Sequence, residues 1–110
     1  MKKNIFQKEA KKAFLIELNE LKAFYASKDF NVGDLCQEIL NCKGKVFLTG
    51  VGKSGHIANK ISATFSSTGT SSFFIHPAEA LHGDMGMIEK NDCIIVLSKS
   101  GESKEIIDLI

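Results

Sequence analysis

The chain has 110 residues, of which 44% are hydrophobic and 25% are charged, with nine glycines and one proline. This composition is typical of a folded domain, and the length of 110 residues leaves no room for a second full domain. The formal net charge is +1, and all 14 basic residues are lysines, so the chain lacks both a cationic excess and the arginines that often contact guanine and phosphate. We therefore expect no nucleic-acid partner and no membrane-surface partner.

Neither the cysteines nor the N-terminal segment contains a recognisable functional motif. The spacing of Cys36, Cys42 and Cys93 matches neither a zinc motif nor a redox motif, so three reduced structural thiols are expected. The lysine-rich start lacks the uninterrupted apolar stretch of a secretory signal, and no segment approaches the roughly 18 apolar residues of a membrane span. By elimination, we expect a cytoplasmic location.

Two helices are predicted first. Over residues 5–25 apolar side chains recur at steps of three and four, which is typical of an amphipathic helix with lysines and glutamates on the other face. A shorter helix is predicted over residues 34–42, with Asp34 accepting its N-terminal amides. The side chains expected to point inward from it are Leu35, Ile39 and Leu40.

After Gly44 short apolar runs alternate with joints rich in glycine and serine, which is typical of β-α-β units in a parallel sheet. Strands are predicted over residues 45–49, 71–75 and 92–97, with helices starting near Ser54 and Gly101. Because a parallel sheet is covered on both faces, the fold class is α/β, with three α-β-α layers.

The predicted domains are a helical lead-in over residues 1–43, packed against the sheet, and a partial α/β domain over residues 44–110. A sheet of only three strands leaves an exposed edge, so we expect a domain truncated after about three strands. We also expect the 110-residue chain to be catalytically inactive alone and to self-associate or be marginally folded.

The first joint, GVGKSG at residues 50–55, lies between a predicted strand and a predicted helix, where backbone amides and the helix dipole favour an anion. A Walker loop is excluded because Phe47 occupies the position of its first glycine. The G-x-G-x-x-G spacing fits a dinucleotide loop, but the second strand ends at Ile75-His76-Pro77 without an acid for the ribose, which disfavours NAD. Lys53 in this joint can stabilise negative charge on a substrate oxygen.

The second joint, SKSGES at residues 98–103, also follows a strand and opens a helix. Its hydroxyls and free amides would bind a phosphomonoester, and Gly101 would allow the backbone to approach it closely. The plainer alternative is that Ser98 or Ser100 only caps the helix. Ligands of open α/β sheets bind at the carboxyl ends of strands, so two such joints together favour the phosphate.

Residues 76–86 form a polar segment between the joints, predicted as a loop, with two histidines and two acids. Such side chains bind zinc or transfer protons near neutral pH. The alternative for any one histidine is a structural, hydrogen-bonded role, which we expect of His56.

The two joints together resemble the sugar isomerase (SIS) domain, whose serine-rich loop binds the phosphate of phosphosugars. Residues 67–88, STGTSSFFIHPAEALHGDMGMI, resemble the D-arabinose 5-phosphate isomerase family, which supplies the precursor of 3-deoxy-D-manno-octulosonate (Kdo) for lipopolysaccharide or capsule. The resemblance covers residues 44–110. It implies an SIS-type fold, interconversion of D-ribulose 5-phosphate and D-arabinose 5-phosphate, and a homo-oligomer, a tetramer in that family. Members of the family continue through further strands and usually two CBS domains.

The resemblance also implies roles for individual residues. The catalytic residues would be Lys53, His82 and Glu105. The substrate-binding residues would be Gly52, Ser54, Gly69, Thr70, His82, Ser98, Lys99, Ser100, Gly101 and Ser103. His76 resembles a position that is linked to zinc in this family. Because zinc there inhibits the enzyme and is not needed for the reaction, no required cofactor is expected. The identity of the base stays open between His82 and Glu105. The alternative function is a non-catalytic phosphosugar-binding SIS module, which needs the serine loop but not the three catalytic residues together.

Overall fold

The computed structural model describes residues 2–81, 84–101, 104 and 107. The chain divides into two compact units, residues 1–36 and residues 37–110. Among the described residues no helix combines the length and the apolar character needed to cross a bilayer.

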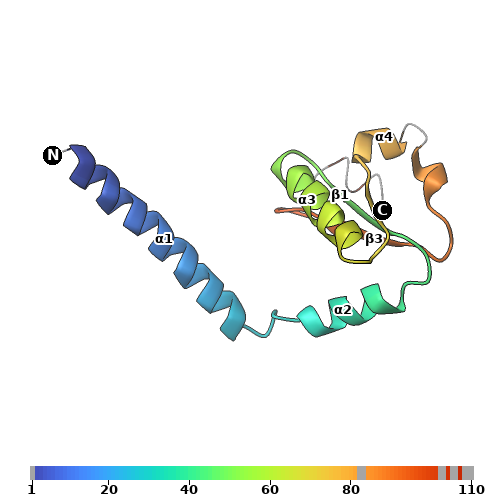
Figure 1. Cartoon of the computed structure of the whole chain (residues 1–110), viewed down its shortest axis with the longest axis horizontal. Helices are drawn as coiled ribbons and strands as arrows, with labels where there is room; N and C mark the ends of the chain where they lie inside the picture. Colours follow the sequence, from blue (N-terminus) through green and yellow to red (C-terminus); the bar gives the residue numbers. More distant parts are fainter. Residues whose placement is uncertain (1, 82–83, 102–103, 105–106, 108–110) are drawn as a thin grey trace. The chain divides into compact units, whose positions relative to one another are not determined.

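The first unit is built on α1 (Lys2–Ala26), which confirms the first predicted helix and extends it by one turn at the start (Figure 1). Every residue of α1 is described, and none of them is buried. Beyond its end, the ring of Phe30 packs edge-on against Phe24 and Tyr25, at centroid distances of 5.3 and 5.9 Å. These ring contacts fix the turn that leads into α2 (Val32–Asn41). Packing of α1 on the sheet stays a prediction.

The helix α2 starts two residues earlier than predicted. In its second half Ile39 packs against the core of the second unit, as expected. The inward orientation expected of Leu40 was wrong, because this side chain is 79% exposed. Neighbouring positions on a helix are separated by about 100° around its axis, and with Ile39 facing the core Leu40 is turned toward solvent.

The second unit is a parallel sheet in which the central strand β1 (Val46–Gly50) is flanked by β2 (Ser72–Phe74) and β3 (Cys93–Leu97). All three strands were predicted to within one residue at each end. Every residue of β1 is buried, as expected for the middle strand of a covered parallel sheet. The described strands and helices form an SIS-type α/β arrangement, and β2 and β3 are the edges of the described sheet.

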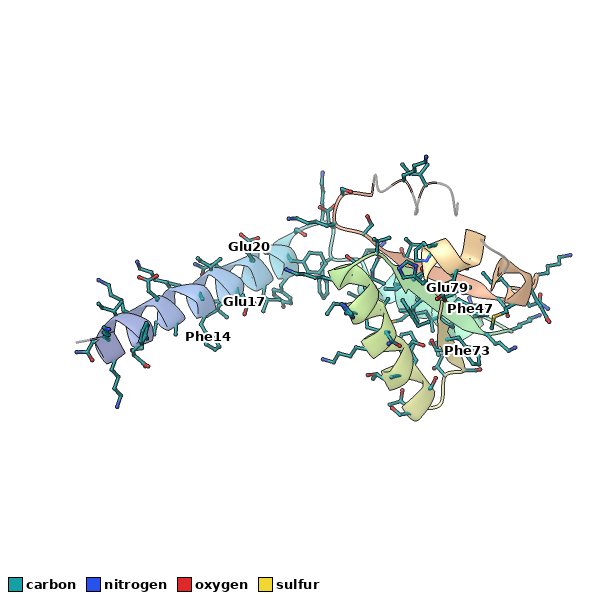
Figure 2. The ribbon with its side chains drawn as sticks, turned by 90° about the horizontal axis from the view of Figure 1, so that it is seen from above. Phe14, Glu17, Glu20, Phe47, Phe73 and Glu79 are labelled. Carbon is teal, nitrogen blue, oxygen red and sulfur yellow. The ribbon has the colours of Figure 1, made fainter. Side chains whose placement is uncertain are left out.

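Alternate side chains of β1 enter two separate cores, as strand geometry requires. Val46 and Leu48 pack with Ala58 of α3 (Lys53–Ser67), which lies along one face of the sheet (Figure 1). Phe47 packs on the other face, in a cluster formed with Ile75, Ala80 and Ile88. Figure 2 shows Phe47 close to Phe73 of β2, with a ring-centroid distance of 5.9 Å.

The segment predicted as a polar loop contains two short helices, α4 (Pro77–Leu81) and the 3-10 helix η1 (Asp84–Met87). Pro77 occupies the first helical position, where its missing N–H is not needed, and the good helix formers Ala78, Glu79 and Ala80 follow. The Ala80 N–H donates to the His76 carbonyl over 2.9 Å, which closes the turn. The helix places Ala80 in the core beneath it.

Candidate anion-binding site at the strand ends

Glycines allow α3 to start directly against the end of β1. A Cβ atom on Gly55 would lie 2.6 Å from the Gly50 carbonyl oxygen, and one on Gly50 would lie 2.8 Å from the Ser54 carbonyl carbon. Between them Gly52 has a φ of +62°, a conformation that side chains other than glycine rarely adopt. The G-x-G-x-x-G spacing is therefore explained by backbone contact between a strand end and a helix start.

The start of α3 presents backbone N–H groups without side-chain competition. The first amide bonded within this turn is that of His56, which donates to the Gly52 carbonyl over 3.2 Å. Among the described residues no side chain caps the helix, so the amides of its first turn are available to an anion. The positive end of the helix dipole adds to this preference. Lys53, the first helical residue, is exposed, and Ser54 is half-buried.

The second joint lies directly beside the first. Gly50 at the end of β1 pairs with Leu97 at the end of β3, so Ser98 begins the next segment one residue past this pair. The Ser98 hydroxyl oxygen accepts the Gly101 N–H over 2.8 Å, and Gly101 has a φ of +69°. This is the contact expected of the capping alternative, and it still leaves the hydroxyl proton of Ser98 able to donate to a ligand. Lys99 and Ser100 in the same turn are exposed.

A cleft of about 290 Å³ adjoins the first joint, close to the lower end of the sizes that bind small molecules. Its walls come from the end of β1, from α3 and from the end of β2. The lining residues are Gly50, Gly52, Gly55, His56, Asn59, Phe74 and His76. Sequence reasoning missed three of these, since His56 was expected to be structural and Asn59 and Phe74 carried no signal. The available hint was the three-residue spacing of His56 and Asn59, which places both on one helix face.

The hydrogen bonding of His76 argues against zinc at this side chain. The Ala78 N–H donates to His76 Nδ1 over 3.1 Å, so in the neutral ring the proton is on Nε2. A metal at Nε2 would leave both ring nitrogens without a proton, whereas histidine ligands normally keep an N–H on the other nitrogen. In the described part of the chain no three His, Cys, Asp or Glu side chains are grouped to hold a metal. With this hydrogen bond His76 offers an Nε2–H donor to the cleft, and inhibitory zinc at His76 stays a prediction.

The structure brings most of the predicted substrate-binding residues together, but not all. Gly52, Lys53 and Ser54 lie at the first joint, and residues 98–101 lie at the second. Gly69 and Thr70 are separated from them by the 15 residues of α3, a length of about 22 Å. There Gly69 has a φ of +104° and the Thr70 N–H donates to the Phe65 carbonyl over 2.8 Å, so this pair ends the helix. His82, Ser103 and Glu105 lie outside the described residues.

The central strand is also the point where the strand order reverses. β2 lies on one side of β1 and β3 on the other, and ligands of open α/β sheets bind at such a reversal. The uncapped amides at the start of α3, the exposed ammonium of Lys53 and the Ser98 hydroxyl meet there. The fold is thus an α/β fold, and its candidate site at the carboxyl ends of the strands is suited to a small anionic ligand.

Residues 39–110 match the SIS domain, and the chain belongs to this family. It is 50% identical over 107 residues to the arabinose 5-phosphate isomerase KdsD of Salmonella typhi, covering 96% of this chain and 32% of the relative. It is 64% identical over 72 residues to the arabinose 5-phosphate isomerase KpsF of Escherichia coli O6:H1, covering 66% of this chain and 22% of the relative. The chain thus spans a third or less of the length of these curated relatives.

A solved structure is similar over nearly the whole chain. An Escherichia coli CFT073 protein in complex with arabinose 5-phosphate has a TM-score of 0.84 and 44% identity, covering 96% of this chain and 57% of that one. The family expected from the two joints is therefore confirmed, and so is the SIS-type fold.

Proposed function

We propose that this chain forms the phosphosugar-binding part of an isomerase that interconverts D-ribulose 5-phosphate and D-arabinose 5-phosphate for Kdo synthesis. The observation that carries the proposal is the pair of anion-binding joints held side by side by the pairing of Gly50 with Leu97. The names of the relatives and the sugar phosphate in the similar structure support the choice of substrate.

Each joint has a role in this reaction. The Ser98–Gly101 turn would bind the phosphate through hydroxyl and backbone donors, which a doubly charged phosphate prefers. Moving a proton between C1 and C2 passes through an enediol, and the exposed ammonium of Lys53 would stabilise the negative charge on its oxygen. Asn59 and the Nε2–H of His76 line the adjoining cleft and would donate to sugar hydroxyls. The base would be His82 or Glu105.

No metal or other cofactor is required in this proposal, because proton transfer and charge stabilisation both come from side chains. We also propose that the protein is cytoplasmic and forms a homo-oligomer. Self-association is supported by the two edge strands, since β2 and β3 leave backbone groups available for pairing in the described sheet.

The test combines binding and turnover. Calorimetric titration with arabinose 5-phosphate should show that Ser98→Ala weakens binding about tenfold or more, since a hydrogen bond to a charged group is removed. Ser67→Ala is the matched control, because Ser67 lies at the far end of α3 and its hydroxyl bonds the Thr64 carbonyl. A coupled assay of arabinose 5-phosphate formation by the full-length protein then tests the reaction. Binding without turnover would instead favour the non-catalytic SIS module.

A further inference from the structure

Two cysteines that are far apart in sequence meet at the amino end of the sheet. Cys42 follows the last residue of α2 and precedes β1, whereas Cys93 is the first residue of β3. Because β1 and β3 are parallel neighbours, with Val46 paired to Cys93, both cysteines lie at the same edge of the sheet. Both pack against the core formed by Val46 and Leu48.

One carbonyl group connects the two residues. The Lys45 carbonyl accepts the Cys93 N–H over 2.9 Å and the Cys42 thiol over 3.6 Å. The Cys42 thiol also lies 3.5 Å from the Asn91 carbonyl oxygen, two residues before Cys93. These two contacts hold the sulfur atom of Cys42 next to the start of β3.

The cysteine pair is open to small reagents. Cys42 and Cys93 are both free and half-buried, and they line a cleft of about 290 Å³ flanked by Glu38 and Lys90. Interaction with the Cys42 thiol, helped by burial, raises the pKa of Cys93 to about 11. Cys93 therefore keeps its proton at neutral pH, and its side chain lines the same cleft and packs on the same core as that of Cys42.

We propose that Cys42 and Cys93 form a dithiol modification site that a small-molecule disulfide converts into an intramolecular disulfide. Cys42 as thiolate attacks one sulfur of the reagent, which breaks the reagent's S–S bond and releases its first thiol. Cys93 then attacks the Cys42 sulfur of this mixed disulfide and releases the second thiol. Two electrons pass from the cysteine pair to the reagent, and the two cysteine protons end on the two released thiols.

The bond would lie at the end of the sheet opposite to the candidate site. It would tie the end of α2 to the start of β3 and close a loop of about 50 residues, which restricts the unfolded chain. We expect the oxidised protein to melt about 5 °C or more above the reduced protein. Ligand binding at the carboxyl ends of the strands should not change.

The test uses the whole chain and oxidised glutathione as the probe. Trypsin would leave Cys36 and Cys42 together in the peptide of residues 29–43, so the experiment is done in the Cys36→Ser variant, in which only the two proposed cysteines remain. The expected product is the peptide of residues 29–43 cross-linked to that of residues 91–99, lost on reduction. Both thiols should also disappear in a thiol titration, and the melting temperature should rise.

Other products would overturn the proposal. Two thiols that stay free, glutathione adducts on the separate peptides, or cross-links between two chains would each show that the cysteines cannot bond within one molecule. The Cys36→Ser, Cys42→Ser variant should give no cross-link and no rise in melting temperature. The same reaction on the unfolded Cys36→Ser protein in urea should give a smaller cross-linked fraction, because only the fold holds the pair together; an equal fraction would contradict the geometry.

Discussion

Replacing Gly55 by alanine tests the close approach of α3 to β1. The added Cβ would lie 2.6 Å from the Gly50 carbonyl oxygen and 3.3 Å from its carbon. Neither atom can move easily, because every residue of β1 is buried in the middle of the sheet. Overpacking costs about 1–3 kcal/mol, and the upper end applies where backbone meets backbone. Alanine recovers up to about 1 kcal/mol as the better helix former, so the net loss is about 2 kcal/mol.

This loss should lower the melting temperature by about 10 °C, measured by circular dichroism. The matched control is Gly33→Ala in α2, where an added Cβ meets nothing within 4 Å and stability should stay equal or rise slightly. Affinity for inorganic phosphate should fall in Gly55→Ala and not in Gly33→Ala, because the shifted helix start carries the amides of the first joint. A Gly55→Ala protein that melts within about 2 °C of the unmodified chain and binds phosphate equally well would refute the reasoning.

Three further outcomes are expected. Thr49→Val should stabilise the chain by up to about 1 kcal/mol in urea unfolding, because the buried Thr49 hydroxyl has no partner among the described residues; a clear loss would reveal a partner. Asp92→Asn should lower the melting temperature at neutral pH, because the carboxylate accepts the Glu89 and Lys45 amides, each over 2.7 Å. These bonds hold the pKa of Asp92 below its ordinary value of 3.8, so the stabilisation is present above that pH and disappears as the pH falls through the lowered value. The difference from Asp92→Asn should therefore narrow at low pH, and a constant difference would contradict this origin. Lys53→Ala should reduce isomerase turnover in the full-length protein by about a hundredfold while Lys60→Ala, on the exposed part of α3, keeps it; near-normal turnover in Lys53→Ala would remove its proposed role.

The strands and the joints could be predicted because they depend on local sequence. Short apolar runs such as residues 45–49 and 92–97 are bounded by glycine and serine, and the order of strand, joint and helix follows from that alternation. This order alone predicted that the two joints lie at the same edge of the sheet. The short helix α4 was missed because it has only five residues and lies in a polar segment with two histidines, which was predicted to be a loop.

The rest depends on tertiary contacts that no local pattern encodes. Asn59 and Phe74 reach one cleft only because α3 lies across β1 with a particular rotation. Cys42 and Cys93 meet only through the register of β1 with β3, so their spacing in sequence matched no motif. Gly69 and Thr70 were predicted to bind substrate from the family resemblance alone, and the fold places them at the far end of α3, so their role stays a prediction.

The central position of β1 also has a consequence for the order of folding. Val46 pairs with Ser72 on one side and with Cys93 on the other, and the second pairing closes a loop nearly twice as long as the first. Doubling a loop costs about 0.6 kcal/mol in closure entropy, and the β1–α3–β2 unit contains mostly local contacts. We therefore expect this unit to form early and β3 to add later. The first joint would then exist before the second, and the anion site would be completed only when β3 pairs with β1.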